Sequence, residues 1–248
     1  MVAHCLLVET ERDGLILVDT GVGTRDVADP GRLGGAFVRL VRPQLEMSRT
    51  AVAHVERMGF SARDVRHIVP THLDVDHVGG LADFPEATVH VFPSELDAAI
   101  HPTIRERERY RQVHWAHGPR WQRIQGGGET WNGLHDVRTL DGLDHEVRIV
   151  PMAGHTRGHV LVGVPDGART WLHCGDAYFH EHVVDASRLG PGPALRLFEQ
   201  MVAVDRDAVR ENHRTLRHLA LTRSADLDLF SAHDPREFAR SLAPARRS

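Results

Sequence analysis

The segment Thr71–Gly80 concentrates histidine and aspartate side chains in the order Thr-His-Leu-Asp-Val-Asp-His-Val-Gly-Gly. On an extended segment the alternating His72, Asp74 and Asp76 point to one side, and His77 then turns back toward the same place. Imidazole nitrogens and carboxylate oxygens at this spacing suit one or two divalent cations. The alternative is a solvated turn rich in His and Asp. We disfavour it because three further segments repeat the pattern.

Each of these segments places ligand-type residues just after an apolar run, at a turn made by glycine or proline. The run 66–70 precedes the first motif, and the other runs lead to His155, Asp176 and His233. Loops that leave strand ends are where α/β proteins carry their chemistry. Four such turns can converge on one edge of a layered β-structure, so we expect these side chains to meet there.

Apolar runs separated by turn residues predict strands, and apolar residues at helical spacing predict helices. Strands are expected at 4–9, 14–19, 66–70, 88–92, 146–151, 159–164, 169–174 and 227–232. Helices are expected at 33–46, 49–59, 93–100, 103–113, 193–203, 205–220 and 235–242. Residues 101–145 interrupt this pattern and read as an insertion at one edge. The whole suits two β-sheets between outer helical layers, in a single domain covering residues 1–248.

The ordered motifs THLDVDHVGG, GHTRGH, GDAYF and SAHDP, with a hairpin ending Leu-Val-Asp19-Thr-Gly, resemble the metallo-β-lactamase superfamily. The resemblance spans roughly residues 4–236 and points to the branch that holds lactonases and glyoxalase II-type thioesterases. It implies an α/β (α+β layered) fold: an αββα sandwich of two mixed β-sheets flanked by helices. The metal site would lie at one edge of the two sheets.

The resemblance also implies a dinuclear metal site and a hydrolytic mechanism. The implied ligands are, for a first cation, His72, Asp74 and His155; for a second cation, Asp76, His77 and His233; and, bridging both, Asp176. Zinc is the expected metal, with manganese or iron as alternatives. A hydroxide held between two metals would attack a carbonyl carbon, so no protein nucleophile is needed. Asp76 and Tyr178 are assigned catalytic roles.

Two positions depart from the family pattern. The usual motif has histidine where this chain has Asp74, whose shorter and harder carboxylate favours manganese or ferrous iron over zinc. Lactonases of the family place a tyrosine three residues after the bridging aspartate, whereas Tyr178 lies two residues after Asp176 and Phe179 occupies the third position. Tyr178 therefore has an alternative role as a packing residue.

Two further residues are candidates for orienting ligands. Asp19 either orients a ligand or forms a turn by bonding to Gly21. His159 has a suitable offset from His155 for an orienting role.

Composition excludes several other mechanisms. All 30 basic residues are arginine, so neither a Schiff-base lysine nor a phosphate-loop lysine is available. The chain also lacks a Gly-x-Ser-x-Gly elbow and a Gly-x-Gly-x-x-Gly fingerprint. A net charge of −4, no long apolar span, no signal peptide and two cysteines predict a cytoplasmic protein. We expect a small-molecule substrate, with no nucleic-acid or membrane partner, and a homodimer as one possible assembly.

The expected function is a metal-dependent hydrolase that opens a small ester or lactone, with N-acyl homoserine lactones as the leading substrates. A glyoxalase II-type thioesterase is the first alternative, for which Arg236 and Arg240 are the only close candidates to hold glutathione. An iron-dependent oxidoreductase and a non-catalytic metal-binding protein of the same fold are the others.

Overall fold

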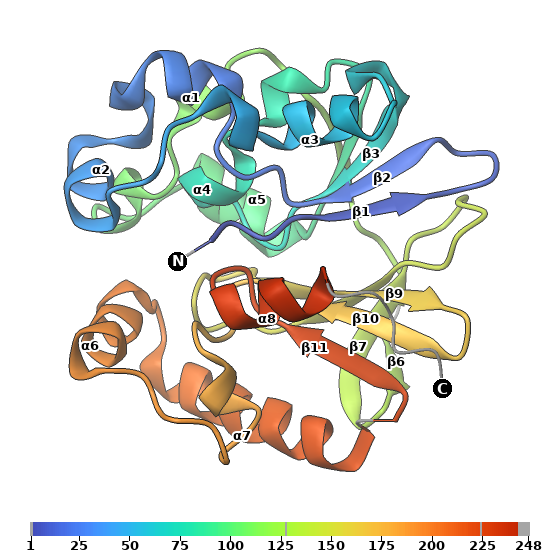
Figure 1. Ribbon diagram of the computed structural model, residues 1–248, viewed down its shortest axis with the longest axis vertical. Helices are drawn as coiled ribbons and strands as arrows, with labels where there is room; N and C mark the ends of the chain where they lie inside the picture. Colours follow the sequence, from blue (N-terminus) through green and yellow to red (C-terminus); the bar gives the residue numbers. More distant parts are fainter. Residues whose placement is uncertain (1, 127, 224, 243–248) are drawn as a thin grey trace. The chain divides into compact units, whose positions relative to one another are not determined.

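The computed structural model describes residues 2–126, 128–223 and 225–242, and the chain divides into two compact units (Figure 1). The first unit comprises Cys5–Gly126 and Asp141–His145. The second unit comprises Met1–His4, Gly127–Leu140 and Glu146–Ser248. Each unit is built on one mixed β-sheet with its own helices and hydrophobic core.

The sheet of the first unit has the order β1-β2-β3-β4-β5. Its strands are β1 (Leu6–Glu9), β2 (Leu15–Val18), β3 (Val65–Val69), β4 (Thr88–Val91) and β5 (Arg120–Arg123). The predicted hairpin is confirmed, since β1 runs antiparallel to β2, while β2 to β5 are all parallel. All four residues of β2 are buried, as expected for a strand covered on both faces. Because β2 and β3 are parallel neighbours, their carboxyl ends lie side by side.

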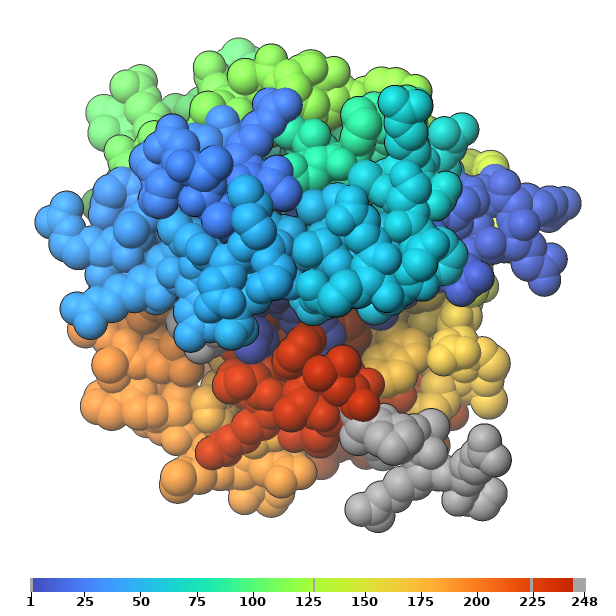
Figure 2. Space-filling model, turned by 45° about the horizontal axis from the view of Figure 1, so that its top comes forward, coloured from blue at the N-terminus to red at the C-terminus, as the bar shows by residue number. Residues whose placement is uncertain are grey.

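Short helices connect these strands. They are α1 (Thr24–Ala28), α2 (Gly35–Val41), α3 (Ala51–Arg57), α4 (Val75–Val78) and α5 (Pro93–Ile100). The Thr50 hydroxyl caps α3, and Val55 of that helix packs into a core with Ile68 and Leu96. In Figure 2 the segment from α1 to α3, coloured mid-blue to cyan, forms part of the visible surface of this unit.

The sheet of the second unit has the order β11-β10-β9-β8-β7-β6. Its strands are β6 (Glu129–Trp131), β7 (Leu134–Thr139), β8 (Arg148–Pro151), β9 (Val160–Asp166), β10 (Arg169–His173) and β11 (Leu227–Phe230). Only the pair β10–β11 is parallel among the described strand pairs of this sheet.

Three helices belong to this unit: α6 (Pro193–Val202), α7 (Arg206–Arg223) and α8 (Pro235–Ser241). Leu216 and Leu219 of α7 pack against Leu161, Leu172 and Leu227 of the sheet. Within the described ranges of the chain, no helix is both long and apolar enough to cross a membrane.

The strands predicted from sequence are all present. The helix predicted at 33–46 is confirmed only in part, because α2 ends at Val41, and the helix predicted at 103–113 is wrong. Residues 103–113 contain only single 3-10 turns, η5 (Glu106–Glu108) and η6 (Gln112–His114). Arginine at every second position leaves no continuous apolar face, and Arg109 and Arg111 instead contact distant residues of the unit. The segment predicted as an insertion contributes β5 to the first sheet and β6 and β7 to the second.

Candidate metal centre

The first group of candidate ligands lies where β3 ends, in the first unit. His72 follows this strand in an extended segment, but Asp74 is already the N-cap of α4. The prediction that His72, Asp74 and Asp76 alternate along one extended segment is therefore wrong, because Asp76 and His77 lie on the first turn of a helix. Gly79 ends this helix. Glycine is required at this position because a side chain there would collide with the Asp26 carboxylate.

Asp19, at the end of the neighbouring strand β2, orients both imidazoles of this group. Its carboxylate accepts hydrogen bonds from the Thr71 backbone N–H (2.7 Å) and the Thr71 hydroxyl, and Asp19 Oδ2 lies 2.8 Å from His77 Nδ1. The Thr71 hydroxyl lies 3.0 Å from His72 Nδ1. Both rings are thus held through Nδ1, with their centroids 4.0 Å apart. This arrangement supports the orienting role of Asp19, and Nε2 of each ring is the nitrogen suited to a cation.

Asp74 has a neighbour on each side of its carboxylate. Oδ2 lies 3.6 Å from His72 Nε2, and Oδ1 lies 3.5 Å from the Nε of Arg109. Arg109 lies in the segment for which the sequence predicts a helix at 103–113, and its contact with Asp74 was not predicted. Asp76 is half-buried on α4.

The second group of candidate ligands belongs to the second unit and comes from three separate loops. His155 lies between β8 and β9, Asp176 follows β10 and His233 follows β11. His155 Nε2 is 3.4 Å from Asp176 Oδ2, while His233 Nε2 is 3.1 Å from Asp176 Oδ1. All three residues are buried. One buried carboxylate therefore offers a different oxygen to each of two imidazoles.

Each member of this second group has its own support. His233 Nδ1 lies 2.7 Å from the Val2 carbonyl oxygen, which leaves Nε2 facing Asp176. His159 Nε2 accepts a hydrogen bond from the Asp176 backbone N–H at 3.0 Å, so His159 supports the backbone that carries Asp176. The ring of Phe179 stacks on His233 with centroids 5.3 Å apart and meets His155 edge-on.

Tyr178 is placed away from these ligands. Its side chain has no exposed surface, and its hydroxyl donates a hydrogen bond to Glu237 Oε1 at 3.0 Å. Burial, followed by the neighbouring Glu237, raises the pKa of Tyr178 well above its usual range. Burial likewise raises the pKa of Glu237 to about 7. These contacts support the alternative role of Tyr178 as a buried packing residue.

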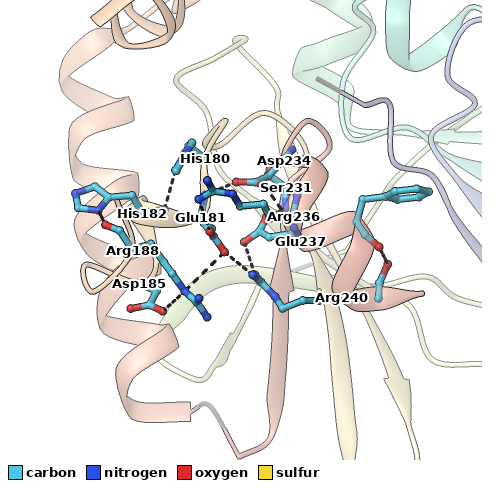
Figure 3. Close-up of polar contacts among 12 residues, drawn as sticks. His180, Glu181, His182, Asp185, Arg188, Ser231, Asp234, Arg236, Glu237 and Arg240 are labelled. Atoms are coloured by element: carbon cyan, nitrogen blue, oxygen red, sulfur yellow. Dashed lines mark hydrogen bonds and ion pairs between the residues drawn. The ribbon is translucent and has the colours of Figure 1, made fainter. Parts of the chain in front are cut away.

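A polar network holds the loop that carries His233 (Figure 3). Asp234 caps α8 by accepting hydrogen bonds from the Arg236 and Glu237 backbone N–H groups, and Asp234 Oδ2 accepts one from the Glu181 N–H at 2.6 Å. The buried Glu181 carboxylate pairs with Arg236 (3.1 Å) and with Arg240. Both arginines proposed to hold glutathione are therefore engaged in fixing this loop.

The donors in both groups fit divalent cations. Each group combines imidazole with carboxylate, and three of the imidazoles have Nδ1 held by a protein atom, as metal-binding histidines require. Cys174, two residues before Asp176, has a buried thiol that donates to the Leu172 carbonyl, and burial raises its pKa well above the usual range. Its low thiolate character makes it a packing residue.

Comparison with known proteins identifies the class. The family model for the metallo-beta-lactamase superfamily matches residues 1–219, so the chain belongs to this superfamily. A probable metallo-hydrolase of Mycobacterium tuberculosis is 45% identical over 236 residues, which cover 95% of this chain and 75% of that protein. The chain is therefore a metallo-hydrolase of the superfamily.

Two further comparisons involve lactonases. The N-acyl homoserine lactonase AttM of Rhizobium johnstonii is 29% identical over 176 residues, covering 70% of this chain and 64% of that protein. The solved structure of an N-acyl homoserine lactone hydrolase, with N-hexanoyl-L-homoserine at its catalytic metal centre, matches with a TM-score of 0.66 and 22% identity. It covers 95% of this chain and 82% of that protein. The predicted fold, with two mixed sheets flanked by helices, is confirmed.

Proposed function

We propose that this protein is a metal-dependent hydrolase of small esters or lactones, with N-acyl homoserine lactones as the leading substrates. The observation that carries the proposal is the position of Asp176, whose two carboxylate oxygens face His155 and His233 separately. A carboxylate that served only one imidazole would not need this arrangement. It suits a carboxylate shared by two cations.

The residues assigned to the metals come from both donor groups. We assign His72, Asp74 and His155 to one cation, Asp76, His77 and His233 to the other, and Asp176 to both. When bound, two divalent cations polarise a carbonyl and lower the pKa of water. Zinc is the first expectation. Manganese and iron remain alternatives because Asp74 adds a hard oxygen donor.

The protein's own side chains orient the donors and exclude water. Asp19 fixes the rotation of the His77 ring, and the Val2 carbonyl does the same for His233. Phe179 covers the face of His233 with an apolar ring, which removes water from that side. A dry, fixed donor set strengthens electrostatic stabilisation of a tetrahedral oxyanion.

The choice of lactones over thioesters rests on two observations. Relatives near 30% identity include N-acyl homoserine lactonases. The two arginines on which a glutathione site would depend are paired with the buried Glu181.

The first test is metal content followed by a substrate panel. The full chain, purified without added metal or chelator, is analysed by elemental mass spectrometry and then assayed with N-acyl homoserine lactones, simple esters and thioesters. We expect close to two equivalents of divalent metal and the highest kcat/KM for a lactone. The proposal would be contradicted by less than one equivalent of divalent metal per chain from cells grown with added metal. It would also be contradicted by turnover of thioesters alone.

Asp176→Asn tests the shared carboxylate. Since changing residues that merely support ligands costs about 10–100-fold, we expect this ligand change to lower kcat/KM by roughly 100-fold or more and to reduce bound metal. Asp207→Asn is the matched control, because the Asp207 side chain is 86% exposed on α7 of the same unit. Loss of activity in both variants would point to a general effect on folding.

A further inference from the structure

The segment that carries Arg109 is joined to the first donor group at two consecutive positions. Arg109 Nε lies 3.5 Å from Asp74 Oδ1. The next residue, Tyr110, donates its hydroxyl hydrogen bond to Glu95 Oε1 at 3.0 Å, and the same oxygen accepts one from the Leu73 backbone N–H at 2.9 Å. Residues 109 and 110 are thus tied to residues 73 and 74.

These contacts account for the irregular backbone between residues 103 and 114. A helix here would spread Arg109, Tyr110 and Arg111 around its axis. The two 3-10 turns instead let Arg109 reach Asp74 while Arg111 donates from Nε to the Arg32 carbonyl at 2.8 Å. The local structure is determined by anchoring and not by helix propensity.

The Asp74–Arg109 pair is largely withdrawn from solvent. The side chains are 13% and 14% exposed, respectively, so neither charge is well hydrated. Under these conditions, removing one partner deprives the other of a close opposite charge, which is costly. Asp74 also faces His72 Nε2 through its other oxygen, so the guanidinium contacts a carboxylate that belongs to the donor group.

We propose that Asp74 and Arg109 act as one unit, in which Arg109 is a positioning residue for the anionic ligand Asp74. The guanidinium fixes the carboxylate so that Oδ2 faces His72 Nε2, where the two residues would hold a cation, and its charge balances the negative charge that Asp74 brings. A neutral ligand at position 74 would leave the Arg109 guanidinium beside the donor group without the Asp74 carboxylate, so we expect it to disfavour a bound cation. This inference rests on the proposed function, since it requires a cation at this group.

A double-mutant cycle on the full chain tests the pair, with zinc affinity as the readout. Apo-protein competes with a chromophoric chelator for zinc ions, and the variants are Asp74→His, Arg109→Gln and the double variant. We expect Arg109→Gln to weaken zinc binding roughly tenfold and Asp74→His to weaken it by about 100-fold. The double variant should bind zinc at least about tenfold more tightly than Asp74→His, because it lacks a cationic side chain beside a donor group that has lost the Asp74 carboxylate.

Arg107→Gln is the matched control, since Arg107 is exposed in the same segment. The inference is overturned if Arg109→Gln behaves like this control, or if the effects of the two single changes simply multiply in the double variant. If Asp74→His does not fold, the zinc affinities of Arg109→Lys and Arg109→Gln are compared instead. Lysine keeps the charge, so it should retain more zinc affinity than glutamine, and equal losses would contradict a role for charge.

The two proposals fail in distinguishable ways. A wild-type chain that binds none of zinc, manganese and iron would remove the proposed function itself. A wild-type chain that binds metal, with no coupling between positions 74 and 109, would remove only the present inference.

Discussion

The two donor groups of this protein are constructed differently. In the first unit, His72, Asp74, Asp76 and His77 lie in one short stretch, and a single carboxylate, Asp19, supports both of its imidazoles, His77 directly and His72 through Thr71. In the second unit the three donors come from three loops of one sheet, and each has its own support. The two imidazoles of the contiguous group therefore share one supporting carboxylate, whereas each donor of the dispersed group has a support of its own.

This difference should change how strongly mutations near each group lower zinc affinity and kcat/KM. Loss of a shared orienting residue releases several ligands together, whereas loss of one of several supports releases a single ligand. Changes around the first group should therefore be more damaging than equivalent changes around the second.

The largest effect is expected for Asp19→Ala. Asp19 accepts from Thr71 and contacts His77 Nδ1, and Thr71 in turn contacts His72, so two imidazoles lose their orientation at once. We expect kcat/KM and zinc affinity to fall by about 100-fold, the upper end for residues that support ligands. Asp97→Ala is the control, because Asp97 is exposed on α5 of the same unit. A change below about fivefold would show that the first group is held by other contacts.

The sheet beneath the first group should make the protein sensitive to acid. His90 of β4 is buried, with Nε2 2.9 Å from His67 Nδ1 on β3, and burial followed by the nearby His67 lowers the pKa of His90 to about 4. Between this value and the unfolded value of 6.5, the unfolded chain binds more protons than the folded one. The stability contributed by neutral His90 is thus complete above pH 6.5 and is lost as the pH falls toward 4.

Urea unfolding at pH 8 and pH 5 measures this loss. For His90 alone the free energy of unfolding should fall by about 2 kcal/mol between the two conditions. His90→Gln keeps a hydrogen-bonding side chain without a titrating proton, so its stability should vary less with pH. An identical pH dependence in both proteins would mean that His90 is not the group responsible.

A smaller effect is expected at the second group. His159→Leu removes the acceptor of the Asp176 backbone N–H, but the contacts of His155 and His233 with Phe179 and Val2 remain. We expect zinc affinity to fall by roughly tenfold, the lower end of the range for supporting residues. His159→Gln, which restores an acceptor, should recover part of the loss. A loss as large as that of Asp19→Ala would contradict the contrast between the two groups.

The same contrast explains how much could be predicted from the sequence. Strands and their terminal turns are encoded locally, so the motifs around His72, His155, Asp176 and His233 could be found by reading along the chain. Arg109 could not, because its role depends on a contact with Asp74 across 35 positions of the chain (109 − 74 = 35). The helix predicted at 103–113 failed for the same reason, since distant anchors override local periodicity.

The smallest effect on catalysis is expected for Tyr178→Phe. The sequence alone allowed either a catalytic role or a packing role for this residue. Tyr178→Phe removes a hydroxyl whose hydrogen bond reaches Glu237, while Glu237 also accepts from the Ser231 backbone N–H at 2.8 Å. Loss of one donor to this buried carboxyl should lower stability by about 1–2 kcal/mol and raise the pKa of Glu237 further, because the Tyr178 hydrogen bond lowers it. Activity per folded molecule should stay near the wild-type value, measured as kcat/KM alongside thermal unfolding. A Phe variant that is as stable as the wild type but has lost most of its kcat would instead place the hydroxyl at the substrate, and Asp176 would then have a catalytic partner two residues away.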